Sequence, residues 1–158
     1  MKKLSSIICI TLALCATSAF AKDMATGKNK KAMENAVFFE AKDLQWKAAA
    51  DLEGAQSAVV HGDPTKGAYH AFMKLKPGFS EPMHYHTADQ YVTVLGGTII
   101  LTEKNGTEHR LPAGSYFSFV NKARHSTMCA QGAECLLFAD IRGKWDVILE
   151  KENTISSK

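Results

Sequence analysis

The chain has 158 residues, of which 46% are hydrophobic and 22% are charged, and its formal net charge is +3 at pH 7. This length is enough for one domain and, once a leader is removed, too short for two ordinary ones. A charge this small argues against nucleic acid as a partner, because phosphate binding requires a basic patch of Lys and Arg. We therefore expect a single small domain that does not bind nucleic acid.

Residues 1–21 have the pattern of a secretory signal peptide. Lys2 and Lys3 form a basic start, residues 7–14 are apolar, and the segment ends in Ala-Phe-Ala, a small-x-small cleavage site. The apolar stretch is shorter than the roughly 20 residues that a membrane-spanning helix needs. Cleavage near Ala21 removes both lysines and lowers the formal charge to +1. We expect a periplasmic or secreted protein without stable membrane insertion.

Polar and charged residues dominate 22–35, which predicts a flexible N-terminal arm. The next segment, 36–50, is ambiguous. Val37, Phe38 and Phe39 favour a strand, whereas residues 47–52 tolerate a helical turn. The phenylalanines suit either a core or contact with a second subunit, so a homodimer is one expected assembly.

Short strand-like segments alternate with turn signals through the rest of the chain. Asn105-Gly106 is a strong hairpin signal, because Asn and Gly readily adopt the left-handed angles of a type I′ turn. No long helix is predicted, and many short strands indicate an antiparallel sandwich or barrel across residues 36–150, followed by a polar tail at 151–158. The expected strands are 57–61, 69–75, 91–95, 98–103, 108–111, 116–120, 124–129, 134–141 and 145–149.

His84 and His86 are the first candidate site residues. Side chains two apart in a strand point to the same face, so both imidazoles can enter one cavity. Gln90 has the same even parity and joins them if the link 87–89 does not invert it. Nitrogen ligands on one face, with polar groups nearby, suit a divalent transition metal.

The spacing around these histidines resembles the first cupin motif, in which Gly, five residues, His-x-His, a Glu and a second Gly follow one another. Here Gly78 precedes His84 and His86, Gln90 stands where the motif has Glu, and Gly97 closes the motif. The second cupin motif is matched at its first Gly and its His, by Gly114 and His125, whereas its Pro, second Gly and Asn are replaced. The resemblance covers roughly residues 69–140. It implies an all-β, antiparallel double-stranded β-helix or jelly-roll barrel that brings His125 to the histidine pair.

The resemblance implies a metal site of His84, His86, His125 and Gln90, with Gln90 either ligating the ion or hydrogen-bonding a bound water. Iron, manganese, nickel, copper and zinc all suit such ligands, and geometry selects among them. Without the usual Glu, the ion would keep its full +2 charge and favour an anionic ligand. The site would also lack the carboxylate that often acts as a base beside the metal.

Four cysteines are present, and Cys9 and Cys15 leave with the signal peptide. A lipoprotein cleavage before Cys15 is an alternative, although Leu14 stands where a small residue is expected. Cys129 and Cys135 flank a turn-like Gln-Gly-Ala, which suggests paired strands of a hairpin. Three states remain open for them: buried free thiols, a disulfide, or a thiol that joins the metal site.

Two functions follow from this reading. Cupins include many dioxygenases, and three histidines resemble the sites of the thiol and diketone dioxygenases of that superfamily. A metal-dependent dioxygenase acting on a small, anionic molecule is therefore the first hypothesis. The alternative is a non-catalytic periplasmic protein that binds a small molecule or a metal ion in the same pocket.

Overall fold

The computed structural model describes residues 36–49 and 52–150. The chain divides into two units, Met1–Phe38 and Phe39–Lys158, and all the described strands belong to the second. The predicted signal peptide, the arm at 22–35 and the tail at 151–158 lie outside the described residues. No helix in the described part of the chain is long and apolar enough to cross a membrane.

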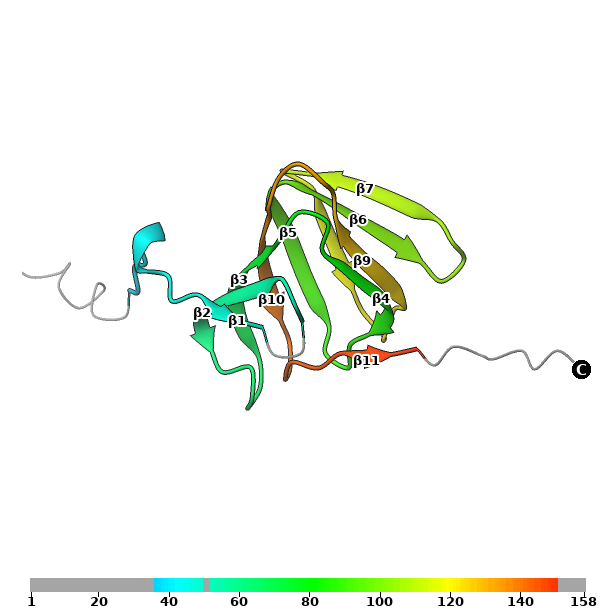
Figure 1. Ribbon diagram of the computed structural model, residues 1–158. Helices are drawn as coiled ribbons and strands as arrows, with labels where there is room; N and C mark the ends of the chain where they lie inside the picture. Colours follow the sequence, from blue (N-terminus) through cyan, green and yellow to red (C-terminus); the bar gives the residue numbers. More distant parts are fainter. Residues whose placement is uncertain (1–35, 50–51, 151–158) are drawn as a thin grey trace, which may run out of the picture. The chain divides into compact units, whose positions relative to one another are not determined.

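The second unit is built from two antiparallel sheets that face each other (Figure 1). The six-stranded sheet has the order β1-β2-β3-β10-β5-β8, and the five-stranded sheet has the order β11-β4-β9-β6-β7. The fold is therefore the all-β, two-sheet barrel expected from the sequence. The strands are β1 (Lys47–Ala48), β2 (Ala55–Gly62), β3 (Tyr69–Leu75), β4 (Ser80–Tyr85), β5 (Gln90–Gly96), β6 (Thr98–Glu103), β7 (Glu108–Pro112), β8 (Tyr116–Phe119), β9 (His125–Cys129), β10 (Cys135–Ile141) and β11 (Ile148–Leu149).

The core lies between the two sheets, where alternate side chains of each strand point inward. In β3, Tyr69, Ala71 and Leu75 are buried and Met73 packs against the core, as the alternation of the sequence predicts. Ile99 of β6 and Ile141 of β10 are fully buried in the same cluster. Burial of these side chains removes apolar surface from water and is the main favourable contribution to folding.

The segment before β2 differs from the expectation. Val37, Phe38 and Phe39 form no strand, while a 3-10 turn spans Ala41–Asp43 and β1 follows at Lys47–Ala48. Val37 and Phe38 are 73% and 80% exposed, and Phe39 is 49% exposed. A place for these side chains in the core is therefore wrong, and their contact with a second subunit stays a prediction.

A disulfide joins Cys129 of β9 to Cys135 of β10. These strands do not form a hairpin, because β9 pairs with β4 and β6 whereas β10 pairs with β3 and β5. The predicted hairpin and the two states with free or metal-binding thiols are therefore wrong. The cystine links the two sheets through two fully buried sulfurs.

Candidate metal centre

Two neighbouring strands of the five-stranded sheet bring three histidines together. His84 of β4 lies directly opposite His125 of β9, and His86 follows immediately after β4 ends. All three are at most 5% exposed, and one ligand nitrogen from each lies within 4.8 Å of the others. The sequence-based expectation that these three imidazoles converge is met.

Backbone carbonyls orient each ring. The Nδ1 of His84 lies 2.7 Å from the carbonyl of Pro82, and the Nδ1 of His125 lies 3.0 Å from that of Ala123. His86 contacts the carbonyl of Asp146 at 2.5 Å through its own Nδ1. A carbonyl only accepts, so Nδ1 carries the proton in all three rings and Nε2 presents a lone pair.

These lone pairs face one another. Nε2 of His84 and Nε2 of His86 are 3.2 Å apart, and neither has a hydrogen to donate. Nε2 of His125 is buried and has no hydrogen-bond partner among the described residues. Two nitrogens that share a tetrahedral ion at about 2.0–2.1 Å lie about 3.3 Å apart. The spacing therefore fits two imidazoles that bind one metal ion.

Burial keeps the three rings neutral near pH 7. Desolvation, together with the neighbouring imidazoles, lowers the pKa of His84 to about 4 and that of His125 to about 3. Desolvation also lowers the pKa of His86. Neutral imidazole is the form that ligates a metal, so the ligands are available without the loss of a proton.

The histidines line a small cavity of about 50 Å³ between the sheets. Gln90 enters it from β5 of the opposite sheet and is 5% exposed, so the link at 87–89 does not turn it away. Most of the remaining lining is apolar, including Phe79, Val92 and Leu137. Gln90 therefore lies in the cavity where the motif has Glu.

Glu81 of β4 lines the same cavity and was missed by the sequence reasoning. Simple alternation would place residue 81 on the opposite face from residue 84, but the pairing of β4 with β9 shifts register between them. Glu81 is 7% exposed, and burial raises the pKa of its carboxyl to about 7. The expectation of a cavity without a carboxylate is therefore wrong. The register shift in β4 explains why Glu81 and His84 both point into the cavity.

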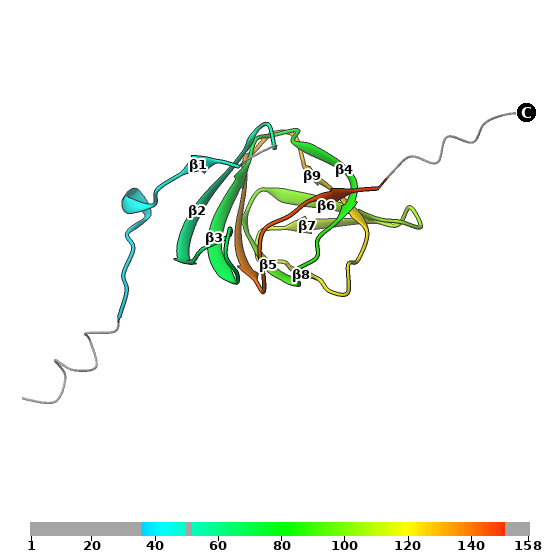
Figure 2. The ribbon, with the colours of Figure 1, turned by 90° about the horizontal axis from the view of Figure 1, so that it is seen from below.

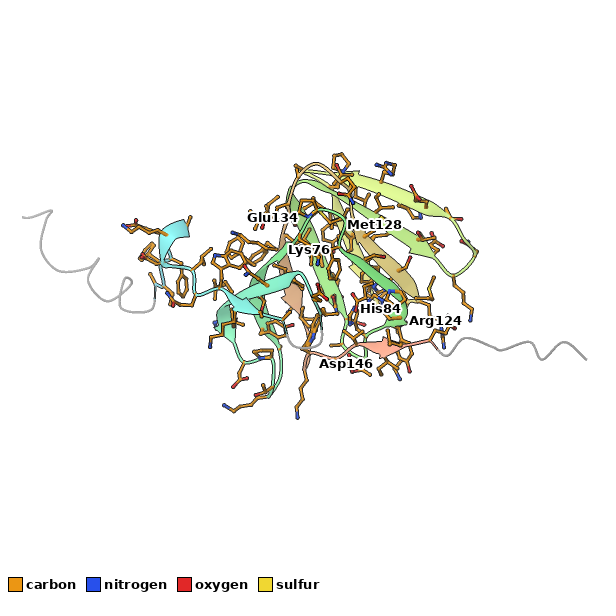
Figure 3. All side chains as sticks on the ribbon, in the orientation of Figure 1. Lys76, His84, Arg124, Met128, Glu134 and Asp146 are labelled. Atoms are coloured by element: carbon orange, nitrogen blue, oxygen red, sulfur yellow. A yellow bond between two sulfur atoms is a disulfide. The ribbon has the colours of Figure 1, made fainter. Side chains whose placement is uncertain are left out.

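The segment between β10 and β11 crosses the end of the barrel (Figure 2), and β11 pairs with β4 at Tyr85 and His84. Trp145 lies over His86, with ring centroids 5.2 Å apart. The Asp146 carboxylate accepts hydrogen bonds from the backbone N–H of Thr87, at 2.9 Å, and from the Thr87 hydroxyl. Figure 3 shows Asp146 and His84 near the same end of the barrel. This segment therefore both covers the cavity and orients one ligand.

The cysteines are separate from this site. Neither lines the cavity, and their sequence neighbours Met128 and Glu134 lie toward the other end of the barrel from His84 in Figure 3. Cys129 shares parity with His125 but bonds to Cys135.

A groove of about 750 Å³ lies beside the cavity and shares Phe117, Phe119 and His125 with it. The Phe119 ring stacks on that of His125, with centroids 3.4 Å apart. Three cationic residues line the groove: Lys104, Lys122 and Arg124. Glu103 also lines it. The groove therefore combines an aromatic wall next to one of the three converging histidines with a rim that carries more basic than acidic residues.

Comparison with known proteins identifies the fold. A family profile described as Domain of unknown function (DUF4437) matches residues 16–148. No curated protein matches the chain. The polyketide cyclase RemF from Streptomyces resistomycificus is similar in structure with a TM-score of 0.63 and 14% identity, over 75% of this chain and 88% of the cyclase.

Two further solved structures are similar. An RmlC-like cupin from Ralstonia eutropha JMP134 gives a TM-score of 0.57 at 22% identity, over 69% of each chain. KdgF from Halomonas sp. gives 0.55 at 20% identity, over 67% of this chain and 94% of KdgF. Identities this low show the fold alone, and that fold is the cupin barrel.

Proposed function

The chain belongs to the DUF4437 family and has the cupin fold, and from this premise we propose that it is a metal-dependent enzyme acting on a small anionic molecule. One observation carries the proposal. Three buried imidazoles each use Nδ1 to contact a backbone carbonyl, and two of their Nε2 atoms face each other at 3.2 Å. Without a cation, this arrangement sets unshared electron pairs against one another in a cavity of low polarity.

The residues present fit a divalent transition ion. His84, His86 and His125 would hold it, and Gln90 lines the same cavity. A bound ion would supply a Lewis acid with open positions for a substrate and, in an oxygenase, for dioxygen. Iron, manganese, nickel, copper and zinc all accept imidazole ligands, so the donor set leaves the choice of metal open.

The basic groove supports an anionic substrate. The cavity itself is large enough for only one or two water molecules, since water occupies about 30 Å³ in the liquid. The larger groove beside His125 can accept a small molecule. Glu150 pairs with Lys104 at 2.7 Å and with Arg124 at 3.0 Å, while Lys122 forms no ion pair within the described part of the chain. A substrate carboxylate or phosphate can pair with Lys122 there.

Dioxygenation is the first reaction that we propose, on the basis of the three-histidine site. A reaction without oxidation is the second candidate. Glu81 favours it, because a buried carboxyl with a pKa of about 7 can accept or donate a proton near neutral pH. Similar folds include the polyketide cyclase and proteins described as DMSP lyases, which supports this second candidate.

An oxygen-electrode experiment tests these reactions. The metal-free protein is loaded separately with Fe²⁺, Mn²⁺, Ni²⁺, Cu²⁺ and Zn²⁺ and is incubated with a panel of small organic acids. Oxygen uptake that accompanies substrate loss supports the dioxygenase. Substrate loss without oxygen uptake supports the second candidate. Retention of an unchanged ligand by the loaded protein supports the non-catalytic alternative and contradicts an enzyme. The control is a His84→Ala/His86→Ala variant, which should show neither reaction.

We also propose that the protein is exported to the periplasm or the medium. The signal-like residues 1–21 support this, and the Cys129–Cys135 disulfide agrees with it, because structural disulfides persist mainly in oxidising compartments. N-terminal sequencing of the native protein should find Lys22 as the first residue. A native N-terminus within the first few residues of the chain would contradict export by cleavage.

A further inference from the structure

Glu81 is a buried carboxylate whose role the cupin motif does not assign. The side chain is 8% exposed, and its Oε1 has no hydrogen-bond partner among the described residues. The surrounding cavity is lined mainly by apolar side chains. A charge in such a place is costly unless it is paired or coordinates a metal. An ionised Glu81 therefore has no cationic partner among the described side chains.

Strand β4 places Glu81 and His84 together. The register shift between these residues turns both side chains inward, and the carbonyl of the intervening Pro82 accepts the Nδ1–H of His84. As a result, Oε2 of Glu81 lies 3.4 Å from Nε2 of His84, the same nitrogen that faces His86. One short stretch of strand thus orients one ligand and sets a carboxylate oxygen beside its free lone pair.

We propose that Glu81 is an anionic ligand of the bound ion, in addition to the three histidines. The inference rests on the proposed metal site. The 3.4 Å between Glu81 Oε2 and His84 Nε2 is close to the spacing of about 3.3 Å for two ligands of one tetrahedral ion. The cluster of converging ligand atoms contains the three histidines and not Glu81, so ligation requires the Glu81 carboxylate to move toward the other two rings. The carboxylate that the motif places on β5, where this chain has Gln90, would then come from β4 instead.

Ligation by Glu81 changes the charge of the centre. Three neutral imidazoles and an amide leave a divalent ion with a formal charge of +2, whereas one carboxylate lowers it to +1. The ion would attract an anionic substrate less strongly than the sequence alone predicts. The lysines and arginine of the neighbouring groove would then contribute more to anion binding.

A metal titration of three proteins tests the proposal. Metal-free full-length protein is titrated with Zn²⁺ against a chromophoric chelator, alongside Glu81→Gln and Glu134→Gln. Glutamine can still donate a hydrogen bond to His84 Nε2, so this substitution removes the negative charge but preserves a possible hydrogen bond. Glu134 pairs with Lys74 at the surface and provides the same substitution away from the cavity.

Wild type and Glu134→Gln should bind one ion with equal affinity. Glu81→Gln should bind at least tenfold more weakly, because loss of even a group that only orients a ligand weakens metal binding by roughly 10–100-fold. A smaller loss in Glu81→Gln would overturn the proposal. If the wild type itself binds no Zn²⁺, the metal site fails and the ligand role fails with it, which is a different result.

A crystal structure of the Zn²⁺-loaded wild type gives a second answer that does not depend on the variant folding. A Glu81 oxygen should lie at about 2.0–2.2 Å from the ion. A carboxylate that stays outside bonding distance would overturn ligation, even if the Glu81→Gln variant binds weakly.

Discussion

The disulfide between the sheets allows a quantitative prediction. Cys129 and Cys135 are six positions apart, and the chain-entropy model assigns about 2 kcal/mol to closing so short a loop. Both sulfurs are fully buried, so replacement by alanine also removes packing contacts. We expect Cys129→Ala/Cys135→Ala to lower the free energy of unfolding by at least about 2 kcal/mol. For a domain of this size, the Tm should fall by roughly 8 °C.

Urea unfolding with and without a reductant measures this effect. Reductant should destabilise the wild type by a similar amount and should leave the double variant unchanged. Metal stoichiometry should be the same in both proteins, because neither cysteine lines the histidine-lined cavity proposed to bind metal. Two free thiols in the unfolded, unreduced wild type would refute the reasoning, as would equal stability with and without reductant.

Three further predictions concern stability. In metal-free protein, His84 and His125 have lower pKa values in the folded chain than in the unfolded chain. Below pH 6.5 the unfolded chain therefore binds protons that the folded chain does not, and the free energy of unfolding falls as the pH is lowered. The raised pKa of Glu81 has the opposite effect, because the folded chain binds that proton more strongly. The net loss in the free energy of unfolding from pH 7 to pH 5, measured by urea unfolding, should be about 2 kcal/mol. A gain in stability over this range would contradict the burial argument. Burial raises the pKa of Glu81 to about 7, so its charge destabilises the folded metal-free protein at pH 8. Glu81→Gln should therefore stabilise that protein by up to about 3 kcal/mol in the same assay. An unchanged unfolding midpoint would show that the buried charge is not destabilising. Gly97→Ala should cost more than about 1 kcal/mol, because φ is +71° and the new Cβ would lie 2.7 Å from the Glu134 carbonyl oxygen. Gly106→Ala, at φ +88° with open space, is the matched control, and an equal loss in both variants would exclude the contact as the cause.

Local sequence patterns predicted the strands of the barrel well, because side chains alternate between the two faces of a strand and the buried face is apolar. Alternating burial along β3 follows directly from the pleat of a strand, and its predicted limits match the structure. The His84/His86 pair shares a cavity for a related reason: His84 points inward from β4, and His86 still faces the same way one residue beyond it. The cupin resemblance supplied the long-range contact with His125, which strand periodicity alone could not provide.

Features that depend on strand irregularity or on pairing between distant segments were not predictable in the same way. Glu81 reaches the cavity through a register shift that alternation does not foresee. Cys129 and Cys135 flank a turn, but their strands pair with other partners, so the hairpin prediction failed. Trp145 lies over His86 because the chain returns across the end of the barrel, and no local pattern marks that path.

Metal content tests the central claim most directly. Protein purified from its native cells is compared by elemental analysis with the His84→Ala/His86→Ala variant prepared in parallel. We expect about one transition-metal ion per wild-type chain and none in the variant. Equal trace amounts in both proteins would show that the three converging imidazoles hold no ion, and the proposed enzyme would be contradicted.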